Sequence, residues 1–332
     1  MSGIRNTAKQ LAVAVFGLAV GGLFLWLALR QVEAREVWRA VAGIHYPTLL
    51  VATIVYWAGI GTRVIRWQLL LRQLKPVPTM KVGETLIVGY AVNNLLPARL
   101  GEVARAAYAK RRLQIGRARV FGSIFIERFL DLIAISGCLL VGLVALRWNA
   151  DFALAPTFEL IALQAGAVIG VLILVVAIFR SEVIERFKMP PALSAILGDF
   201  RLGLATGSRK TVVSGCALTL AVWLLECAAV AQVYAATGID LNVSQSLLLI
   251  GAAALSTLVP TAPGYLGTYQ LVAVLAMSSF GLNTNAGIVA ATATQLALFG
   301  SLTLVGIVIL ATRGVRRLMV DGVNGLRQPS TH

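Results

Sequence analysis

A polar stretch that interrupts an apolar segment near residue 97 carries groups able to bind an anion. It reads Asn93-Asn94-Leu95-Leu96-Pro97-Ala98-Arg99-Leu100-Gly101-Glu102, and Arg105 follows one turn later. A guanidinium group can hold a phosphate through two parallel hydrogen bonds, so Arg99 is the predicted phosphate contact, with Asn94, Glu102 and Arg105 around it. The alternative is an internal Arg99–Glu102 ion pair that only holds the loop. The two are compatible, because a substrate can exchange with an internal partner.

Two further sets of ionisable groups lie inside apolar stretches. The stretch 120–146 opens with Glu127-Arg128-Phe129-Leu130-Asp131, and Glu226 lies well inside 211–236. An ionisable side chain at the centre of a membrane costs at least about 2.5 kcal/mol. We therefore expect Glu127, Arg128 and Asp131 to face the protein interior and neutralise the basic residues near Arg99; the alternative is that they reach out to the interface. Glu226 either relays a proton, pairs with a basic residue, or is a protonated carboxyl group that joins helices.

A second apolar segment, 244–260, ends in another stretch rich in Pro and Gly. It reads Pro260-Thr261-Ala262-Pro263-Gly264-Tyr265-Leu266-Gly267, followed by Thr268, Tyr269 and Gln270. Glycines permit close approach of backbone or ligand, so Pro260, Gly264, Gly267 and Gln270 are predicted to complete the substrate site. We predict no catalytic residue, metal or cofactor. The three cysteines lie in apolar runs, the two histidines stand apart, and the chain lacks the phosphate-binding loop of ATPases.

The elements that position these residues follow from composition. Of 332 residues, 58% are hydrophobic and 13% charged, with a net charge of +15. So little charge cannot cover a soluble surface. The basic residues alternate with apolar runs, which indicates membrane topology and anionic lipid rather than nucleic acid. The sequence therefore predicts an all-α polytopic membrane protein. Six stretches are long enough to span, the first of them a retained helix rather than a signal peptide: 10–29, 42–62, 120–146, 159–179, 211–236 and 286–311.

Charge at the flanks predicts the orientation of the two broken segments. Basic residues stand on both sides of 82–97, including Arg63, Arg66 and Arg72, which are assigned here to the cytoplasm. The flanks of 244–260 contain neither Lys nor Arg. The first segment is thus predicted to enter and leave from the cytoplasm, and the second from outside. Both chain termini are then cytoplasmic.

The order of elements predicts an internal repeat within one transmembrane domain, residues 1–332. Residues 10–146 read as two helices, a re-entrant pair and a helix, and residues 159–311 read alike with opposite orientation. Both breaks contain Pro-x-x-x-Gly. Paired broken helices are typical of inverted-repeat transporters; the alternative is a coincidence of two kinks. The connector 180–210 is predicted to hold a short amphipathic helix at the cytoplasmic interface.

Three short motifs resemble those of the transmembrane, flippase-like region of lysylphosphatidylglycerol synthases and their stand-alone relatives. They are Asn94-x-x-Pro97-x-Arg99-x-Gly101-Glu102-x-x-Arg105, Glu127-Arg128-x-x-Asp131, and Pro260-x-x-Pro263-Gly264-x-x-Gly267. The resemblance covers nearly the whole chain and implies lipid translocation, with the first two motifs forming the site. Where the family's last motif commonly ends in an acid, this chain has Gln270. The soluble aminoacyl-transferring domain has no counterpart here, so lysyl-lipid synthesis is not expected.

These observations favour a lipid transporter of the cell inner membrane, moving a phospholipid, glycolipid or polyprenyl- or hopanoid-type lipid between leaflets. The expected partners are membrane lipids, anionic ones foremost, and a lipid-synthesising enzyme is a candidate partner. No nucleic-acid partner is expected, and a homo-oligomer is compatible with the sequence. One alternative is a membrane-embedded lipid-modifying enzyme that uses Glu102, Glu127 or Asp131 as a base. Another is a non-catalytic partner of a lipid synthase.

The topology can be tested with single cysteines. A cysteine in place of Asp240 should react with an impermeant thiol reagent added outside the cell, because its loop lacks basic residues. A cysteine in place of Ala205, in the basic connector, should react only after the membrane is opened. Equal labelling of both from outside contradicts the predicted orientation.

Overall fold

The computed structural model describes residues 41–96, 100–149, 190–204, 208–257 and 263–326, together with Arg35 and scattered positions between 163 and 177. The predicted spans 10–29 and 159–179 lie largely or wholly outside these residues, as do Pro97, Arg99 and Pro260. Within the described ranges all regular structure is helical. This agrees with an all-α membrane protein.

The described residues form ten α-helices and two short turns of other helix types. They are α3 (Tyr46–Leu71), α4 (Thr79–Leu95), α5 (Leu100–Arg112), α6 (Arg117–Asn149), α8 (Pro191–Gly203), α9 (Arg209–Ala236), α10 (Val243–Ser256), the 3-10 turn η2 (Pro263–Tyr265), α11 (Thr268–Ser279), α12 (Thr284–Thr294), the π turn η3 (Gln295–Phe299) and α13 (Gly300–Leu326). Among these residues four helical segments are long and apolar enough to cross a membrane: Tyr46–Leu71, Arg117–Leu146, Arg209–Ala236 and Thr284–Arg313. They coincide with four of the six predicted spans.

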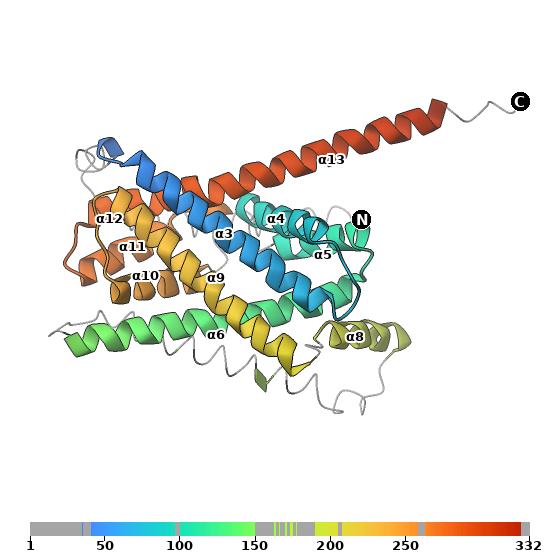
Figure 1. Cartoon of the computed structure of the whole chain (residues 1–332), viewed down its shortest axis with the longest axis horizontal. Coiled ribbons are helices and arrows are strands. Elements are labelled where there is room, and N and C mark those ends of the chain that lie inside the picture. The colour runs from blue at the N-terminus through green and yellow to red at the C-terminus, as the bar shows by residue number, and fades with distance from the viewer. Residues whose placement is uncertain are drawn as a thin grey trace, which may run out of the picture.

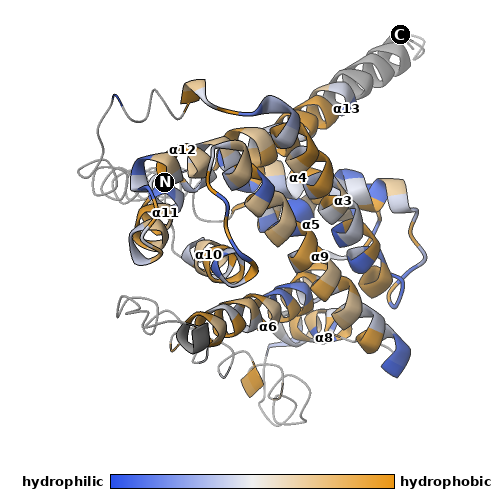
Figure 2. Cartoon of the chain, turned by 60° about the vertical axis from the view of Figure 1, so that its left-hand side comes forward, coloured by the Kyte–Doolittle hydropathy of each residue, from blue (hydrophilic) through white to orange (hydrophobic). Residues whose placement is uncertain are grey.

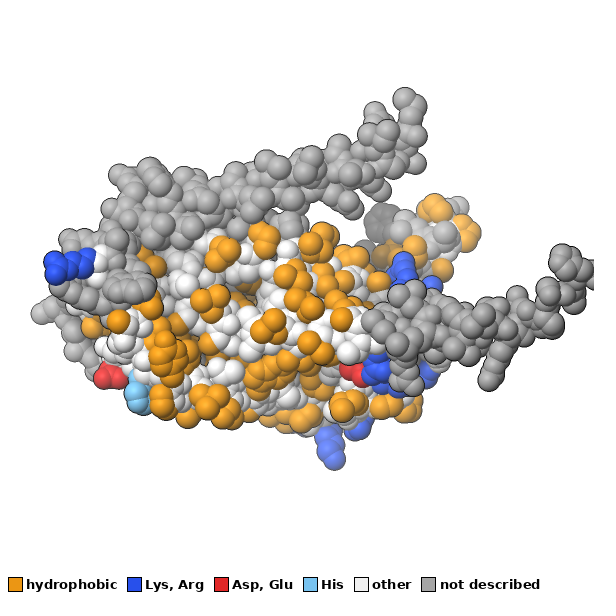
Figure 3. Space-filling view, turned by 90° about the horizontal axis from the view of Figure 1, so that it is seen from above, with side chains coloured by type: hydrophobic (Ala, Val, Ile, Leu, Met, Phe, Trp, Pro, Cys, Tyr) orange, Lys and Arg blue, Asp and Glu red, His pale blue; other side chains and the backbone are white. Residues whose placement is uncertain are grey.

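The outer surface of these four segments is apolar, as lipid contact requires. Exposed large side chains include Ile54, Leu140, Leu220, Leu296 and Val308, one or more from each segment. Hydrophobic residues run along the helices in Figure 2, and in Figure 3 they cover the middle of the visible face, while charged side chains lie towards its ends. A soluble monomer rarely exposes so extensive an apolar surface.

The loops rich in Lys and Arg meet at one end of the bundle. Lys75 after α3 lies 3.3 Å from Gln114 before α6, and Gln73 donates to Thr211 in the first turn of α9 at 3.2 Å. At the opposite end the backbone N–H of His45, before α3, donates to Ala236 O at the end of α9 at 2.8 Å. The loops that the charge pattern assigned to a common side are therefore neighbours in the fold.

The two broken segments form helix pairs that start and finish at opposite ends of the bundle (Figure 1). α4 and α5 pack against each other as an antiparallel hairpin at the basic end, and α10 packs against α11 at the other. The pairs meet in the interior, where a Cβ built on Gly264 would lie 3.6 Å from the carbonyl oxygen of Asn94. Each break falls where the sequence placed it. Leu96, before Pro97, is extended, as residues before proline prefer to be. Gly264 and Gly267 both have positive φ.

One expectation needs correction. Arg63 and Arg66, assigned above to a cytoplasmic flank, lie inside α3 and are buried, because α3 continues to Leu71 rather than stopping near residue 62. The short helix expected in the connector 180–210 is present as α8; Phe200 near its end and Leu204 directly after it pack against α6, and its position at the membrane interface stays a prediction. Phe200 makes an edge-on contact with Phe125, with ring centroids 6.0 Å apart.

Glycine makes the α4–α5 contact possible. A Cβ added to Gly101 would lie 2.1 Å from the carbonyl oxygen of Gly89 and 2.4 Å from Asn93 Oδ1. Such a clash involves backbone and cannot be relieved by a rotamer change. A Cβ on Gly61, on the outer side of α3, meets nothing within 4 Å.

We therefore predict that Gly101→Ala destabilises the protein by about 1–3 kcal/mol, the usual cost of overpacking. Gly61→Ala should be neutral or slightly stabilising, because alanine favours helix. Thermal unfolding of both variants in detergent tests this. Equal midpoints for the two variants contradict the close α4–α5 contact.

Candidate functional site

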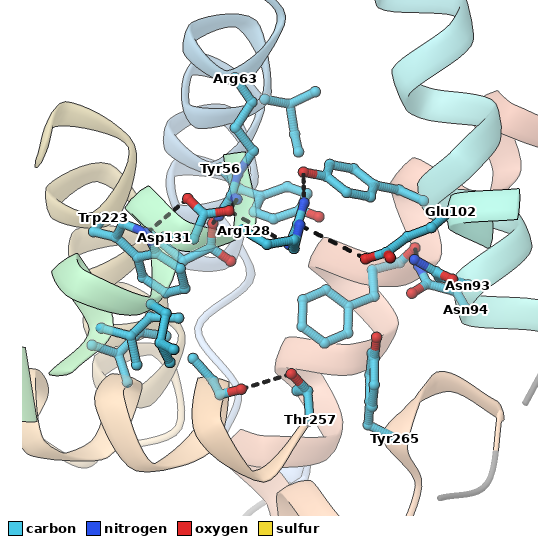
Figure 4. Close-up of a pocket in the computed structure, with 18 of the residues that line it drawn as sticks. Tyr56, Arg63, Asn93, Asn94, Glu102, Arg128, Asp131, Trp223, Thr257 and Tyr265 are labelled. Carbon is cyan, nitrogen blue, oxygen red and sulfur yellow. Dashed lines mark hydrogen bonds and ion pairs between the residues drawn. The ribbon is translucent and has the colours of Figure 1, made fainter. Parts of the chain in front are cut away.

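A cavity of ≈ 350 Å³ lies between the two helix pairs, α3, α6 and α9 (Figure 4). Two kinds of side chain stand out in its lining, beside aliphatic residues and the amides of Asn93 and Asn94. The charged ones are Arg63, Glu102, Arg128, Asp131 and Glu226, and the aromatic ones include Tyr56, Tyr90, Trp223, Tyr265, Tyr269 and Phe299. The cavity thus combines ionic groups with an apolar wall, which is the surface that an amphiphilic ligand needs.

The charged lining rests on a fully buried carboxylate, Glu127. Arg105 of α5 binds it with two hydrogen bonds, of 2.7 and 3.2 Å, and stacks on Trp67 of α3 with its guanidinium carbon 3.6 Å from the ring centroid. Arg66 approaches the same carboxylate at 3.5 Å. A buried charge is tolerated only when it is paired and hydrogen-bonded. Glu127 therefore ties α6 to α3 and to the broken pair α4–α5.

Asp131, one turn after Glu127 on α6, is a second buried carboxylate with several basic neighbours. Its Oδ1 accepts hydrogen bonds from Arg66 at 2.6 Å and from the Trp223 indole at 3.2 Å. Its Oδ2 faces Arg128 at 3.5 Å and Arg63 at 3.9 Å without a hydrogen bond. Arg63 in turn donates to Glu226 at 2.9 Å. Of the roles predicted for Glu226, pairing with a basic residue is therefore the one seen.

Arg128 is the cation most open to a ligand among the charges that line the cavity. It lies between Asp131 and Glu102 (Figure 4), and its side chain is 32% exposed. Its Nη2 donates to Glu127 at 3.0 Å and to the Tyr90 hydroxyl at 3.2 Å, but its Nε lies 3.8 Å from Glu102 and has no hydrogen bond. Glu102 is similarly exposed, at 29%. The Arg128–Glu102 ion pair, at 3.8 Å, is therefore looser than the buried pairs Arg105–Glu127 at 2.7 Å and Arg66–Asp131 at 2.6 Å.

The aromatic wall centres on Phe299, the last residue of the π turn. Tyr56, Tyr265 and Tyr269 surround its ring, with centroid distances of 6.3, 6.5 and 5.4 Å. The Asn94 side chain donates to Phe299 O at 3.3 Å and to Thr303 Oγ1 at 2.9 Å. Asn94 thereby joins the first broken pair to the last span.

Polar side chains cap the broken ends. Asn93 Oδ1 accepts the backbone N–H of Gly101 at 2.7 Å, at the start of α5. Gln270 accepts the N–H of Gly267 at 2.9 Å and donates to Gln295 at 2.6 Å, and Gln295 donates to Gly264 O at 2.8 Å. The backbone N–H groups of Gly101 and Gly267, at the two broken ends, therefore have partners within the protein.

The structure brings part of the predicted site together. Five predicted residues line the cavity: Asn94, Glu102, Arg128, Asp131 and Glu226. Five others pack behind or beside it: Arg105, Glu127, Gly264, Gly267 and Gln270. Arg99 and Pro260 lie outside the described residues.

Sequence reasoning missed Arg63, Arg66 and Trp223. A signal was present: three carboxylates predicted inside the membrane need cations, and Arg63 and Arg66 share one helix face three residues apart. Among the residues described, no group of three or more His, Cys, Asp and Glu could hold a metal ion.

Comparison with known proteins adds the family. The profile described as lysylphosphatidylglycerol synthase TM region matches residues 14–306. A Haloferax volcanii protein named glycosyltransferase AglD is 24% identical over 342 residues, which cover 91% of this chain but 54% of that protein. The chain thus spans about half of that relative's length.

Two proteins described as UPF0104 membrane proteins are also similar. A UPF0104 membrane protein of Methanocaldococcus jannaschii is 27% identical over 192 residues, covering 57% of this chain and 80% of that protein. One of Methanothermobacter thermautotrophicus is 22% identical over 284 residues, covering 78% and 83%.

The buried and exposed ion pairs should differ sharply in their effect on stability. Glu127→Gln leaves Arg105 and Arg66 buried without their shared carboxylate, which costs about 3–5 kcal/mol. Asp199→Asn breaks an exposed pair, Arg119–Asp199, whose side chains are 45% and 39% exposed, and should cost about 0–1 kcal/mol. Unfolding in detergent measures both. A Glu127→Gln protein as stable as Asp199→Asn contradicts the buried network.

Proposed function

The chain belongs to the family of the lysylphosphatidylglycerol synthase TM region, and we propose that it moves a lipid with a phosphate-containing headgroup between the leaflets of the cell inner membrane. The observation that carries the proposal is the cavity in which a loose Arg128–Glu102 pair lies opposite an aromatic wall. A headgroup would occupy the charged side, and the first part of its apolar chain would lie along the rings.

The proposed membrane arrangement is six spans and two re-entrant pairs, with both termini in the cytoplasm. In this arrangement residues 10–146 and 159–311 are inverted repeats, and the connector 180–210 is cytoplasmic. The meeting of α4–α5 and α10–α11 from opposite ends supports it, because broken helix pairs that meet at the midplane are how such transporters form their sites.

The proposed headgroup contact is an exchange of partners at Arg128. A phosphate displaces Glu102, which is 3.8 Å away and holds Arg128 weakly, and gains charge-assisted hydrogen bonds from the guanidinium group. Glu127, Asp131 and Tyr90 keep Arg128 in place during the exchange. Arg99 remains the proposed second contact, from the stretch between α4 and α5.

Two observations favour transport over lipid modification by this chain. Of the three acids considered above as bases, Glu127 and Asp131 accept hydrogen bonds from arginine, which disfavours them and leaves Glu102 as the candidate base. The cavity also lies within the apolar part of the bundle rather than in a domain outside it. The name of the Haloferax relative, glycosyltransferase, keeps a lipid-modifying activity or an enzyme partner as the competing function.

Purified protein in liposomes with fluorescent phospholipid distinguishes these functions. Transport predicts that lipid from the inner leaflet becomes accessible to a membrane-impermeant quencher faster than in protein-free liposomes, with the lipid chemically unchanged. A chemically altered lipid indicates an enzyme. If neither accelerated exchange nor altered lipid is observed, the chain is a non-catalytic partner, and the proposal is contradicted.

Substitutions in the same assay test the site. Arg128→Gln should lower the rate at least about tenfold, since hydrogen bonds to charged groups contribute about 1.5–3 kcal/mol. Arg99→Ala should have a similar effect. Arg119→Gln, at the exposed Asp199 pair, is the control and should leave the rate unchanged. If Arg128→Gln combined with Glu102→Gln restores transport, the pair is structural and Arg128 does not bind the headgroup.

A further inference from the structure

A second cluster of charges lies outside the cavity, where α4, α5 and α13 come together. Glu84 of α4 accepts a hydrogen bond from Arg112 Nε at 2.9 Å and another from Arg313 Nη2. Arg112 is the last residue of α5, and Arg313 is the first charged residue after the apolar run 286–311. The cluster therefore lies at the basic end of the bundle, at the level where a span gives way to the headgroup region.

Among the residues whose side chains are described, this cluster has a net charge of one positive unit. Two guanidinium groups share one carboxylate, whereas in the buried network the number of acids equals the number of arginines. Arg112 uses only Nε, and Arg313 only Nη2, to bind protein atoms among the residues whose side chains the structure describes. Both side chains are about one-third exposed, at 30% and 34%. Several N–H donors that converge on one place are thus open to an anion.

Glu84 stays ionised in this position. Burial raises the pKa of Glu84, but the hydrogen bonds from Arg112 and Arg313 outweigh it and hold the pKa below its ordinary value. The Tyr108 phenol lies near the same charges. Burial, and then Glu84, raise its pKa, so it remains a donor. The excess positive charge is therefore constant at neutral pH.

Apolar side chains flank the cluster on the same helix faces. Leu310, three residues before Arg313, is 38% exposed, and Met80, four residues before Glu84, is 78% exposed. Residues three or four apart stack on one face of a helix. An anion bound by the two arginines would thus have apolar surface beside it, which a free phosphate does not use and an acyl chain does.

We propose that Arg112 and Arg313 bind the phosphate of an anionic phospholipid, whose chains lie against Leu310 and Met80, at a site separate from the cavity. The bound lipid bridges the α4–α5 pair and α13. These elements also supply Asn94 to the cavity and the Asn94–Thr303 contact beside Phe299. This proposal does not rest on the transport function, because it concerns only the binding of a lipid and is tested by measuring that binding.

Binding is measured on the full chain in detergent, by thermal unfolding and by mass spectrometry of the intact protein with bound lipid. Phosphatidylglycerol should raise the unfolding midpoint and remain bound, while phosphatidylcholine and inorganic phosphate should not. Arg112→Gln and Arg313→Gln should each weaken phosphatidylglycerol binding at least about tenfold, the usual effect of losing a charged hydrogen bond. Arg111→Gln is the matched control, since Arg111 is exposed and adjacent, and should change binding less than about twofold.

Glu84→Gln separates a lipid site from a purely structural cluster and guards against a variant that fails to fold. The amide keeps the shape of the carboxylate but no longer competes for the arginines. The lipid-free protein should then be less stable and should bind phosphatidylglycerol more tightly than the unsubstituted chain. Tighter binding supports the proposal, and weaker or unchanged binding overturns it.

Three other outcomes also overturn it. Equal losses in Arg111→Gln and Arg112→Gln mean diffuse attraction to the basic end. Equal effects of inorganic phosphate and lipid mean a site for free anions. Phosphatidylglycerol binding that survives both Arg112→Gln and Arg313→Gln means that the cluster only joins helices. None of these results bears on leaflet exchange, which the liposome assay measures.

Discussion

The buried Glu127 carboxylate is the constraint on which the rest of the structure depends. A carboxylate at this depth must find cations, and no solvent is there to supply a substitute. Arg105 and Arg66 meet that need from α5 and α3, and Arg105 in turn stacks on Trp67. The broken α4–α5 pair is therefore fixed against two spans by charge and by ring contact, although its own helices are too short to span.

A tight interior network permits a loose outer pair. Because Glu127 and Asp131 are held by arginines from two other helices, Arg128 can keep its position while its contact with Glu102 remains long. The cavity gains an accessible cation without the cost of an isolated buried charge. Asn94 of the first broken pair also reaches the aromatic wall, where its side-chain amide donates to the carbonyl oxygen of Phe299.

Periodicity and charge predicted the helices and both breaks, because apolar length, proline and glycine act locally. They also indicated that Glu127 and Asp131 face inward. They did not predict which cations would meet them. From the sequence, Arg63 and Arg66 were expected in a loop, because an arginine near the end of an apolar run usually reaches the interface. The structure shows that α3 continues through both residues, which bind acids of α6 and α9. Gln270 read as a site residue, but its amide caps its own helix.

The balance of buried charge has an electrical consequence. Three buried arginines, Arg63, Arg66 and Arg105, stand with three buried acids, Glu127, Asp131 and Glu226. If this network moves as a unit along the membrane normal, the transmembrane voltage does no net work on it. Each unit charge carried fully across by a bound headgroup is, in contrast, worth about 2.3 kcal/mol per 100 mV. The buried network is therefore electrically neutral, and under the proposed function the membrane potential would act on the charge of the bound headgroup rather than on this network.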